Sequence, residues 1–307
     1  MRKLVAKVAA LTLAAAGTLA TAGPAAAQGH PSEHPGQVTA VLVLGDGTNV
    51  TLSRSSVNEG RIAFKVDTTN STPGSGSNIT LFRLVGHTTL DTFKADLVDE
   101  FSADPAIAAR GTRELNRDIR AFGLADVVPG HPETVTELLT AGQYYLMDLG
   151  NLGNSPPNPV FTTFTVHHSG QGSSHSQGDR HRGPVIKLTS ADRFVSPGTL
   201  PARGTVTVMN VADTIHFMEI EPVLKGTTDT QIQAWFDSFA NATPPPLGPP
   251  PFADGPTGGL DVLSPGHQAE LSYNLPPGTY MLACFVADDV TGMAHAFMGM
   301  HKVVTLK

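Results

Sequence analysis

Cysteine is almost absent from this chain of 307 residues, since Cys284 is the only one. The protein therefore cannot form an internal disulfide, and the thiol must be a buried inert group, a link to another chain or a metal ligand. Charged residues make up only 15% and aromatic residues 6%. Gly (31) and Pro (24) are abundant, which favours many short strands over long helices. The length is suited to about two domains.

Long apolar runs are lacking except at the N-terminus. Residues 1–27 begin with three basic residues, continue as an Ala- and Leu-rich run and end on three alanines. This pattern is typical of a secretory signal peptide cleaved near Ala27, and it predicts a secreted, extracellular protein. A single-pass anchor is disfavoured because Lys7 and Gly23-Pro24 interrupt the run.

An excess of positive charge is also lacking. Without residues 1–27 the chain keeps 17 basic and 27 acidic residues, a net charge of −10. An acidic surface argues against nucleic acid and anionic lipid as partners, and it would suit a basic protein.

Two polar segments separate the predicted folded parts. Residues 28–37 have the composition of a flexible leader, and residues 167–183 contain no apolar residue and are predicted to be a linker. The linker histidines could bind Cu(II) or Zn(II) loosely, although a solvated linker is favoured; they are His167, His168, His175 and His181. The two domains are then residues 38–166 and 184–307.

The two domains match one another in order and spacing. The corresponding segments are 60–66 with 204–210, 79–84 with 215–220, 90–101 with 229–239, 129–131 with 265–267, and 142–146 with 278–282. Most alternate as strands, while 90–101 and 229–239 have a helical pattern. We therefore predict a duplicated all-β domain, two tandem Greek-key β-sandwiches each with a helical insertion. A second, charged helical stretch is predicted over residues 105–122 of the first domain.

Metal-ligating residue types gather in the second domain alone. His216 stands at the place of Thr80, and Cys284 at the place of Asp148. The loop over residues 291–300 contains His295 and three methionines and has no counterpart in the first domain. A thiolate, two imidazoles and a thioether are ligands that suit Cu(I) and tolerate Cu(II).

At this point the second domain resembles the cupredoxins, the blue-copper family that includes plastocyanin. The resemblance rests on Asn210 followed six residues later by His216, on Gly278-Thr-Tyr-Met-Leu-Ala-Cys284, and on His295-Ala-Phe-Met-Gly-Met300. It implies two tandem cupredoxin-like sandwiches, of which the first has lost its ligands. It further implies one copper ion in the second domain, held by His216, Cys284, His295 and Met300. The function implied is electron transfer or copper handling, with a redox or copper-donor protein as partner.

The segment between Cys284 and His295 is longer than the family pattern. It holds ten residues, among them the turn formers Asp288, Asp289 and Gly292, which are expected to loop out and return His295 to the site. His301 and Met293 are spare ligand candidates. The alternative is a metal-free extracellular binding or structural module with a vestigial site, in which His216 is a core histidine and Cys284 a small buried hydrophobe.

An enzyme of the multicopper type is not expected. Such enzymes need further histidines beside the copper-binding cysteine, whereas Ala283 and Phe285 flank Cys284 and no His-x-His motif occurs. No Ser/His/Asp motif or Gly-rich phosphate loop suggests another reaction. The sequence therefore predicts a binding or electron-transfer protein rather than an enzyme.

Overall fold

The computed structural model describes residues 38–71, 76–151, 157–169, 183–240 and 251–307. The predicted signal peptide and leader, and residues 170–182 of the predicted linker, lie outside the described residues. Within the part that is described, no helix has both the length and the apolar character needed to cross a bilayer.

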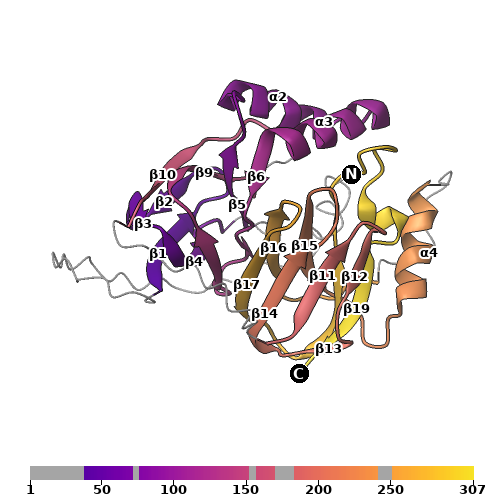
Figure 1. Cartoon of the computed structure of the whole chain (residues 1–307). Coiled ribbons are helices and arrows are strands. Elements are labelled where there is room, and N and C mark those ends of the chain that lie inside the picture. The colour runs from indigo at the N-terminus through magenta and orange to yellow at the C-terminus, as the bar shows by residue number, and fades with distance from the viewer. Residues whose placement is uncertain (1–37, 72–75, 152–156, 170–182, 241–250) are drawn as a thin grey trace.

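The first half contains nearly all of its predicted elements (Figure 1). They are β1 (Thr39–Gly45), β2 (Val50–Leu52), β3 (Ser56–Asn58), β4 (Gly60–Thr68), β5 (Ser77–Leu84), α2 (Leu90–Glu100), α3 (Pro105–Asp118), β6 (Ile119–Ala121), β7 (Asp126–Val127), β8 (Glu133–Leu139), β9 (Gly142–Asp148) and β10 (Thr162–His167). The helix predicted over 105–122 is too long by four residues. Its last segment is strand β6, which pairs with β5 through Phe82, Arg83 and Leu84.

The second half repeats this series with one helix. Its elements are β11 (Val185–Thr189), β12 (Arg193–Val195), β13 (Thr199–Leu200), β14 (Arg203–Asn210), β15 (His216–Pro222), α4 (Asp229–Ala240), β16 (Gly258–Leu263), β17 (Gln268–Asn274), β18 (Gly278–Ala283), the 3₁₀ turn η1 (His295–Met298) and β19 (His301–Leu306).

Strand order is the same in both halves. One layer runs β2-β1-β4-β8 in the first half and β12-β11-β14-β17 in the second. The other layer runs β3-β10-β9-β5-β6 and β13-β19-β18-β15-β16. Both first layers contain a parallel pair, β1 with β4 and β11 with β14. The predicted fold class, two tandem all-β sandwiches with helical insertions, is therefore confirmed.

The two sandwiches share one sheet instead of forming separate sheet systems. Strand β8 pairs antiparallel with β17 in a seam that sets Val135 opposite Leu271, so the two first layers form one eight-stranded sheet. Both strands would otherwise be edges with unpaired N–H and C=O groups, and pairing them satisfies those groups. Backbone bridges Phe122–Leu263 and Ala125–Leu260 join the second layers as well.

Alternation along the strands builds the core between the layers. In β4, Ile62, Phe64 and Val66 are fully buried on one face, while the residues between them are less buried. Phe64 meets Phe164 of β10 edge to face, with ring centroids 5.5 Å apart. This period of two is what a strand with one buried face requires.

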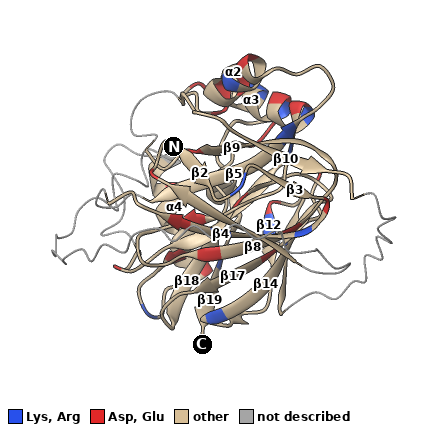
Figure 2. Cartoon of the chain, turned by 90° about the vertical axis from the view of Figure 1, so that its left-hand side faces the viewer, with Lys and Arg blue, Asp and Glu red and all other residues tan. Residues whose placement is uncertain are grey.

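Helices α2 and α3 form a pair on one end of the first half, and Figure 2 shows that residues of both charges occur along them. Asp104 caps α3 by accepting a hydrogen bond from the Ala106 N–H at 2.9 Å, and Pro105 occupies the first turn. The helices approach closely at Gly111, where an added Cβ would lie 2.2 Å from the Glu100 nitrogen. The pair thus makes a rigid platform.

The buried carboxyl of Glu137 makes the stability of the shared sheet depend on pH. It lies on β8 at 3% exposure, and burial raises the pKa of its carboxyl well above the usual range; Arg61 opposes this rise and Glu270 adds to it. The folded protein therefore holds a proton that the unfolded chain releases, and stability contributed by this group is lost as pH rises from about 4.5. We expect Glu137→Gln to gain stability over the native chain between pH 5 and pH 8, by up to about 1.4 kcal/mol per pH unit. Urea unfolding of both proteins at pH 5 and pH 8 measures the free energy of unfolding. A difference between variant and native chain that is equal at the two pH values would contradict the prediction.

Candidate metal centre

Asn210 holds the turn that leads into His216. Its Nδ2 donates to the carbonyl of Thr214 at 2.8 Å and to that of Leu263 at 2.7 Å. Its Oδ1 accepts from the Ala212 N–H at 2.9 Å, and the residue is 1% exposed. A buried amide with all these bonds fixes the loop, so His216 enters β15 in one orientation.

Cys284 follows directly after β18, the neighbour of β15. Ala283 pairs with Glu219, and one more step of that ladder sets Cys284 opposite Met218, two residues beyond His216. A bulge between His216 and Met218 interrupts the pairing with β16. The Phe217 N–H donates to the Cys284 Sγ at 3.5 Å, a contact that favours a thiolate.

The long segment after Cys284 is a closed hairpin, as the turn formers predicted. The Asp288 N–H donates to the Met293 carbonyl at 2.8 Å, and Ala287 bridges Ala294. Asp288 also accepts from the Thr291 N–H through its Oδ1 at 2.6 Å. The hairpin thus leaves the sandwich and comes back, and it returns His295 to the site.

The returning strand is hydrogen-bonded to the departing one. The His295 N–H donates to the Val286 carbonyl at 3.0 Å, and the Ala296 N–H to the Cys284 carbonyl at 2.7 Å. Main-chain bonds therefore fix His295 beside the thiol although ten residues separate the two.

The tip of this hairpin rests on the first half of the chain, and in Figure 1 the yellow loop reaches α3. Gly292 lies so close to α3 that an added Cβ would stand 1.9 Å from the Pro105 carbonyl oxygen. Arg113 of α3 donates to the Asp289 carbonyl, and Glu100 of α2 accepts from the Ala287 N–H at 3.3 Å. The extra length is therefore used for docking against the α2–α3 platform.

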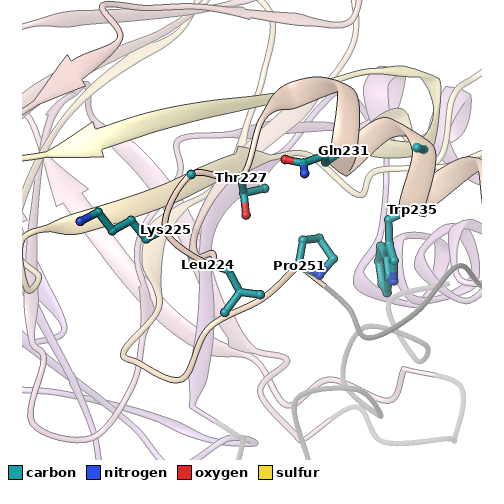
Figure 3. Close-up of a pocket in the computed structure, with 8 residues that line it drawn as sticks. Leu224, Lys225, Thr227, Gln231, Trp235 and Pro251 are labelled. Carbon is teal, nitrogen blue, oxygen red and sulfur yellow. The ribbon is translucent and has the colours of Figure 1, made fainter.

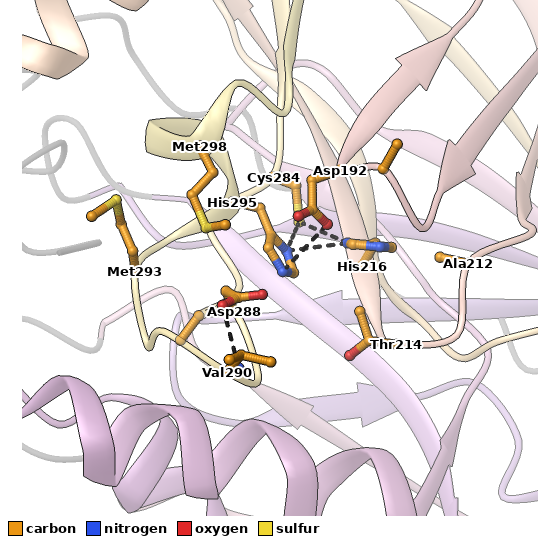
Figure 4. Close-up of polar contacts among 12 residues, drawn as sticks. Asp192, Ala212, Thr214, His216, Cys284, Asp288, Val290, Met293, His295 and Met298 are labelled. Carbon is orange, nitrogen blue, oxygen red and sulfur yellow. Dashed lines mark hydrogen bonds and ion pairs between the residues drawn. The ribbon is translucent and has the colours of Figure 1, made fainter.

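Three donor atoms converge in a buried pocket (Figure 4). The Nδ1 atoms of His216 and His295 are 3.2 Å apart, and the Cys284 Sγ is 3.7 Å from each. All three side chains have no exposed surface. A point equidistant from the three atoms lies about 2.1 Å from each, close to the roughly 2.0–2.3 Å of metal–imidazole and metal–thiolate bonds. The donor set and its spacing fit a trigonal metal site.

Both imidazoles are kept neutral. Burial, together with a smaller effect of the neighbouring His295, lowers the pKa of His216 to about 3. Burial likewise lowers the pKa of His295 to about 4, against an opposing effect of Asp288. A neutral ring presents a lone pair, which a metal ligand needs and an imidazolium lacks.

Met300, the predicted fourth ligand, is fully buried beside these residues. Its N–H donates to the His295 carbonyl at 2.9 Å, and its carbonyl accepts from the Cys284 N–H at 3.2 Å. The main chain thus places it next to the two ligands that precede it, and its role as a ligand stays a prediction. The spare candidate His301 lies elsewhere, bonded through Nε2 to Gln233 Oε1 at 3.0 Å.

In the first half, the position equivalent to Cys284 is occupied by Asp148, which accepts hydrogen bonds. Asp148 pairs with Ile79, so by register the counterpart of His216 is Ser77 rather than Thr80, which corrects the sequence alignment. The Asp148 carboxylate accepts from the Gly47 N–H at 2.8 Å and the Asn78 N–H at 3.0 Å. Thr80 instead donates to Asp261 Oδ2 of the second half at 2.8 Å. In the described residues, the groupings of three potential metal-ligating side chains all lie in the second half.

Asp192 belongs to the surroundings of the site and carried no signal in the sequence. Its Oδ1 lies 3.7 Å from the His295 Nε2. Burial raises its pKa to about 6, repulsion by Asp288 adds to this, and Arg193 opposes it. Asp192 also adopts a left-handed φ of 51°, which Asp tolerates better than most residues.

A separate pocket of about 430 Å³ opens beside α4 (Figure 3). Leu224, Lys225, Trp235 and Pro251 are among its lining residues. None of the metal-site residues is among those that line it.

Comparisons with known proteins find copper proteins among similar structures. No protein-family model matches the chain, and no curated protein matches its sequence. Auracyanin from Roseiflexus castenholzii is 22% identical over 40% of this chain and 94% of its own, with a TM-score of 0.24. Auracyanin B is 18% identical over 41% and 98%, with a TM-score of 0.24. Copper nitrite reductase from Nitrosomonas europaea is 10% identical over 88% and 94%, with a TM-score of 0.21.

The assignment of the fold rests on the molecule itself. The two repeats share one strand order. The three side chains come in the predicted order: His216 from β15, Cys284 from the end of the neighbouring strand β18, and His295 from the loop that follows. The fold is therefore cupredoxin-like, with a candidate copper site in the second sandwich.

Asn210 offers a test of how the site is positioned. Asn210→Ala removes two donated bonds and one accepted bond in a buried setting, so we expect a loss of about 3 kcal/mol in the free energy of unfolding. Copper affinity should fall at least tenfold, because the turn before His216 loses its anchor. Thr205→Ala, which removes a hydroxyl pair with Ser272 on the sheet, is the control and should leave copper affinity unchanged. Equal copper affinities in the two variants would contradict the positioning role.

Proposed function

We propose that this chain is a secreted copper protein that binds one ion in its second sandwich and transfers single electrons. The observation that carries the proposal is the convergence of two imidazole nitrogens and one thiol sulfur around a point about 2.1 Å from each. His216, Cys284 and His295 would hold the ion, and Met300 would be a further, weaker ligand. A bound copper supplies an ion that cycles between Cu(II) and Cu(I) by one electron.

The chain's own residues suit such a cycle. A His₂Cys set with an axial thioether is the ligand arrangement of electron-transfer copper sites. The site is buried and held by main-chain bonds, so its ligands are in place before the metal arrives. The partner is a redox or copper-donor protein, and the acidic surface favours a basic one.

Copper titration of the whole chain tests the proposal. One equivalent of Cu(II) should give an intense visible absorption from charge transfer between thiolate and copper. Adding ascorbate should bleach the colour, and ferricyanide should restore it, since each step moves one electron. A second tight equivalent with the same band would contradict the expectation that the first sandwich binds no copper. A chain that stays colourless and gains no thermal stability with either copper state would leave the metal-free binding module as the function.

A further inference from the structure

A second grouping of possible metal ligands lies on the outer side of His295. Asp192, Asp288 and His295 each place one ligand atom within 4.8 Å of the others. A cation with bonds of roughly 2.0–2.4 Å to oxygen and nitrogen can bridge such a span. The carboxylates are part-buried, with the side chain of Asp192 at 19% exposure, so the grouping can be reached from solvent.

The outer nitrogen of His295 is the observation that points to a ligand here. The side chain is fully buried, and its Nε2 makes no hydrogen bond in the structure. It faces the Asp192 Oδ1 at 3.7 Å, beyond hydrogen-bonding distance. A buried nitrogen without a partner costs stability, and a cation between it and the carboxylates would remove that cost.

Negative charge accumulates at the same place. The carboxylates of Asp288, Asp289 and Asp213 all lie close enough to repel that of Asp192. The nearest opposing charge is Arg193, whose Nη1 donates to three main-chain carbonyls, those of Ala191, Asp192 and Met298. A bound cation would offset the remaining repulsion.

The proton on His295 couples the two sides of the ring. A neutral imidazole carries one proton. When His295 donates it from Nδ1 to the Nδ1 of His216, 3.2 Å away, the Nε2 presents a lone pair to the carboxylates. When copper takes Nδ1, the proton must reside on Nε2, and it then points at Asp192. One ring can therefore serve the outer side or the inner side, and not both at once.

We propose that Asp192, Asp288 and the Nε2 of His295 form an outer site for a hard divalent cation such as Mn(II), and that copper at the inner site closes it. The existence of the outer site is independent of the copper function proposed above, whereas the competition rests on it. In the copper-free protein, the outer site would bind a cation on the solvent side of His295.

Mn(II) is the probe, because it prefers carboxylate oxygen ligands to thiolate. Titrated into the whole copper-free chain, one Mn(II) should bind, seen as loss of the sharp electron paramagnetic resonance signal of the free ion. Asp192→Asn and Asp288→Asn should each weaken binding at least tenfold. The matched control is Asp213→Asn, which removes a nearby negative charge but no proposed ligand. It should change the affinity for Mn(II) less than threefold.

Two further variants separate this proposal from the copper function. Cys284→Ser, which lacks the inner thiolate, should bind Mn(II) as the native chain does, whether or not that chain takes up copper. Copper-loaded protein should bind Mn(II) at least tenfold more weakly than copper-free protein. Equal losses in Asp192→Asn and Asp213→Asn, or no Mn(II) binding, would overturn the outer site. If Asp192→Asn changes only the copper spectrum, Asp192 is a hydrogen-bond partner of His295 and the proposal is wrong.

Discussion

Replacing Cys284 by serine should abolish the intense visible absorption of the copper-loaded protein. The band arises from charge transfer between a thiolate and Cu(II), and a hydroxyl cannot replace the sulfur. Cys284 is fully buried, and its Sγ accepts a hydrogen bond from the Phe217 N–H. Serine is only slightly smaller than cysteine and can accept the same hydrogen bond, so the variant should keep the fold. The expected result is a colourless, folded protein, measured by absorption spectra and circular dichroism with one equivalent of Cu(II).

His301→Gln is the matched control for this change. His301 is also largely buried, at 9% exposure, but it bonds to Gln233 outside the cluster of donor atoms. The control should keep the full absorption. Loss of colour in both variants would show a general effect of disturbing this part of the sandwich, and colour retained in Cys284→Ser would remove the thiolate from the site.

Gly292→Ala should have the second large effect, because it separates the hairpin from the α2–α3 platform. The new methyl group would meet the Pro105 carbonyl oxygen at 1.9 Å, and the residue has a φ of +68°. The hairpin that returns His295 to the site would have to shift. We expect a loss of stability above about 3 kcal/mol, as strain in backbone and packing add, and a copper affinity lower by at least tenfold. Chemical unfolding and copper competition titrations measure the two quantities.

Gly266→Ala isolates the backbone contribution. Gly266 has a similar φ of +76°, and an added Cβ there meets no atom within 4 Å. It should cost only about 1–2 kcal/mol and leave copper affinity unchanged. If Gly292→Ala behaves like Gly266→Ala in both measurements, docking of the hairpin on the first half does not position His295.

The strands, and the convergence of His216, Cys284 and His295, were predictable because their signals are local. The alternation of Ile62, Phe64 and Val66 identifies a strand with one buried face, and the order of His216, Cys284 and His295 survives the long insertion. The turn formers Asp288 and Gly292 correctly indicated a loop that closes on itself.

Contacts between distant segments were not predictable. An edge strand has the same alternation of buried and exposed residues whether it pairs with another edge strand or faces solvent. The pairing of β8 with β17 therefore cannot be predicted from the hydrophobic pattern of either strand. Asp192 lies about a hundred residues from His295, and a lone Asp in a turn has no spacing that points to a site. The counterpart of His216 was misplaced by three residues because the repeats differ in register there.

The seam also bears on how this protein avoids aggregation while it folds. Until both halves have formed, β8 and β17 are open edges that can accept a strand from any other chain. Each half therefore shields the other from self-association, and a single half expressed alone should dimerise through its free strand.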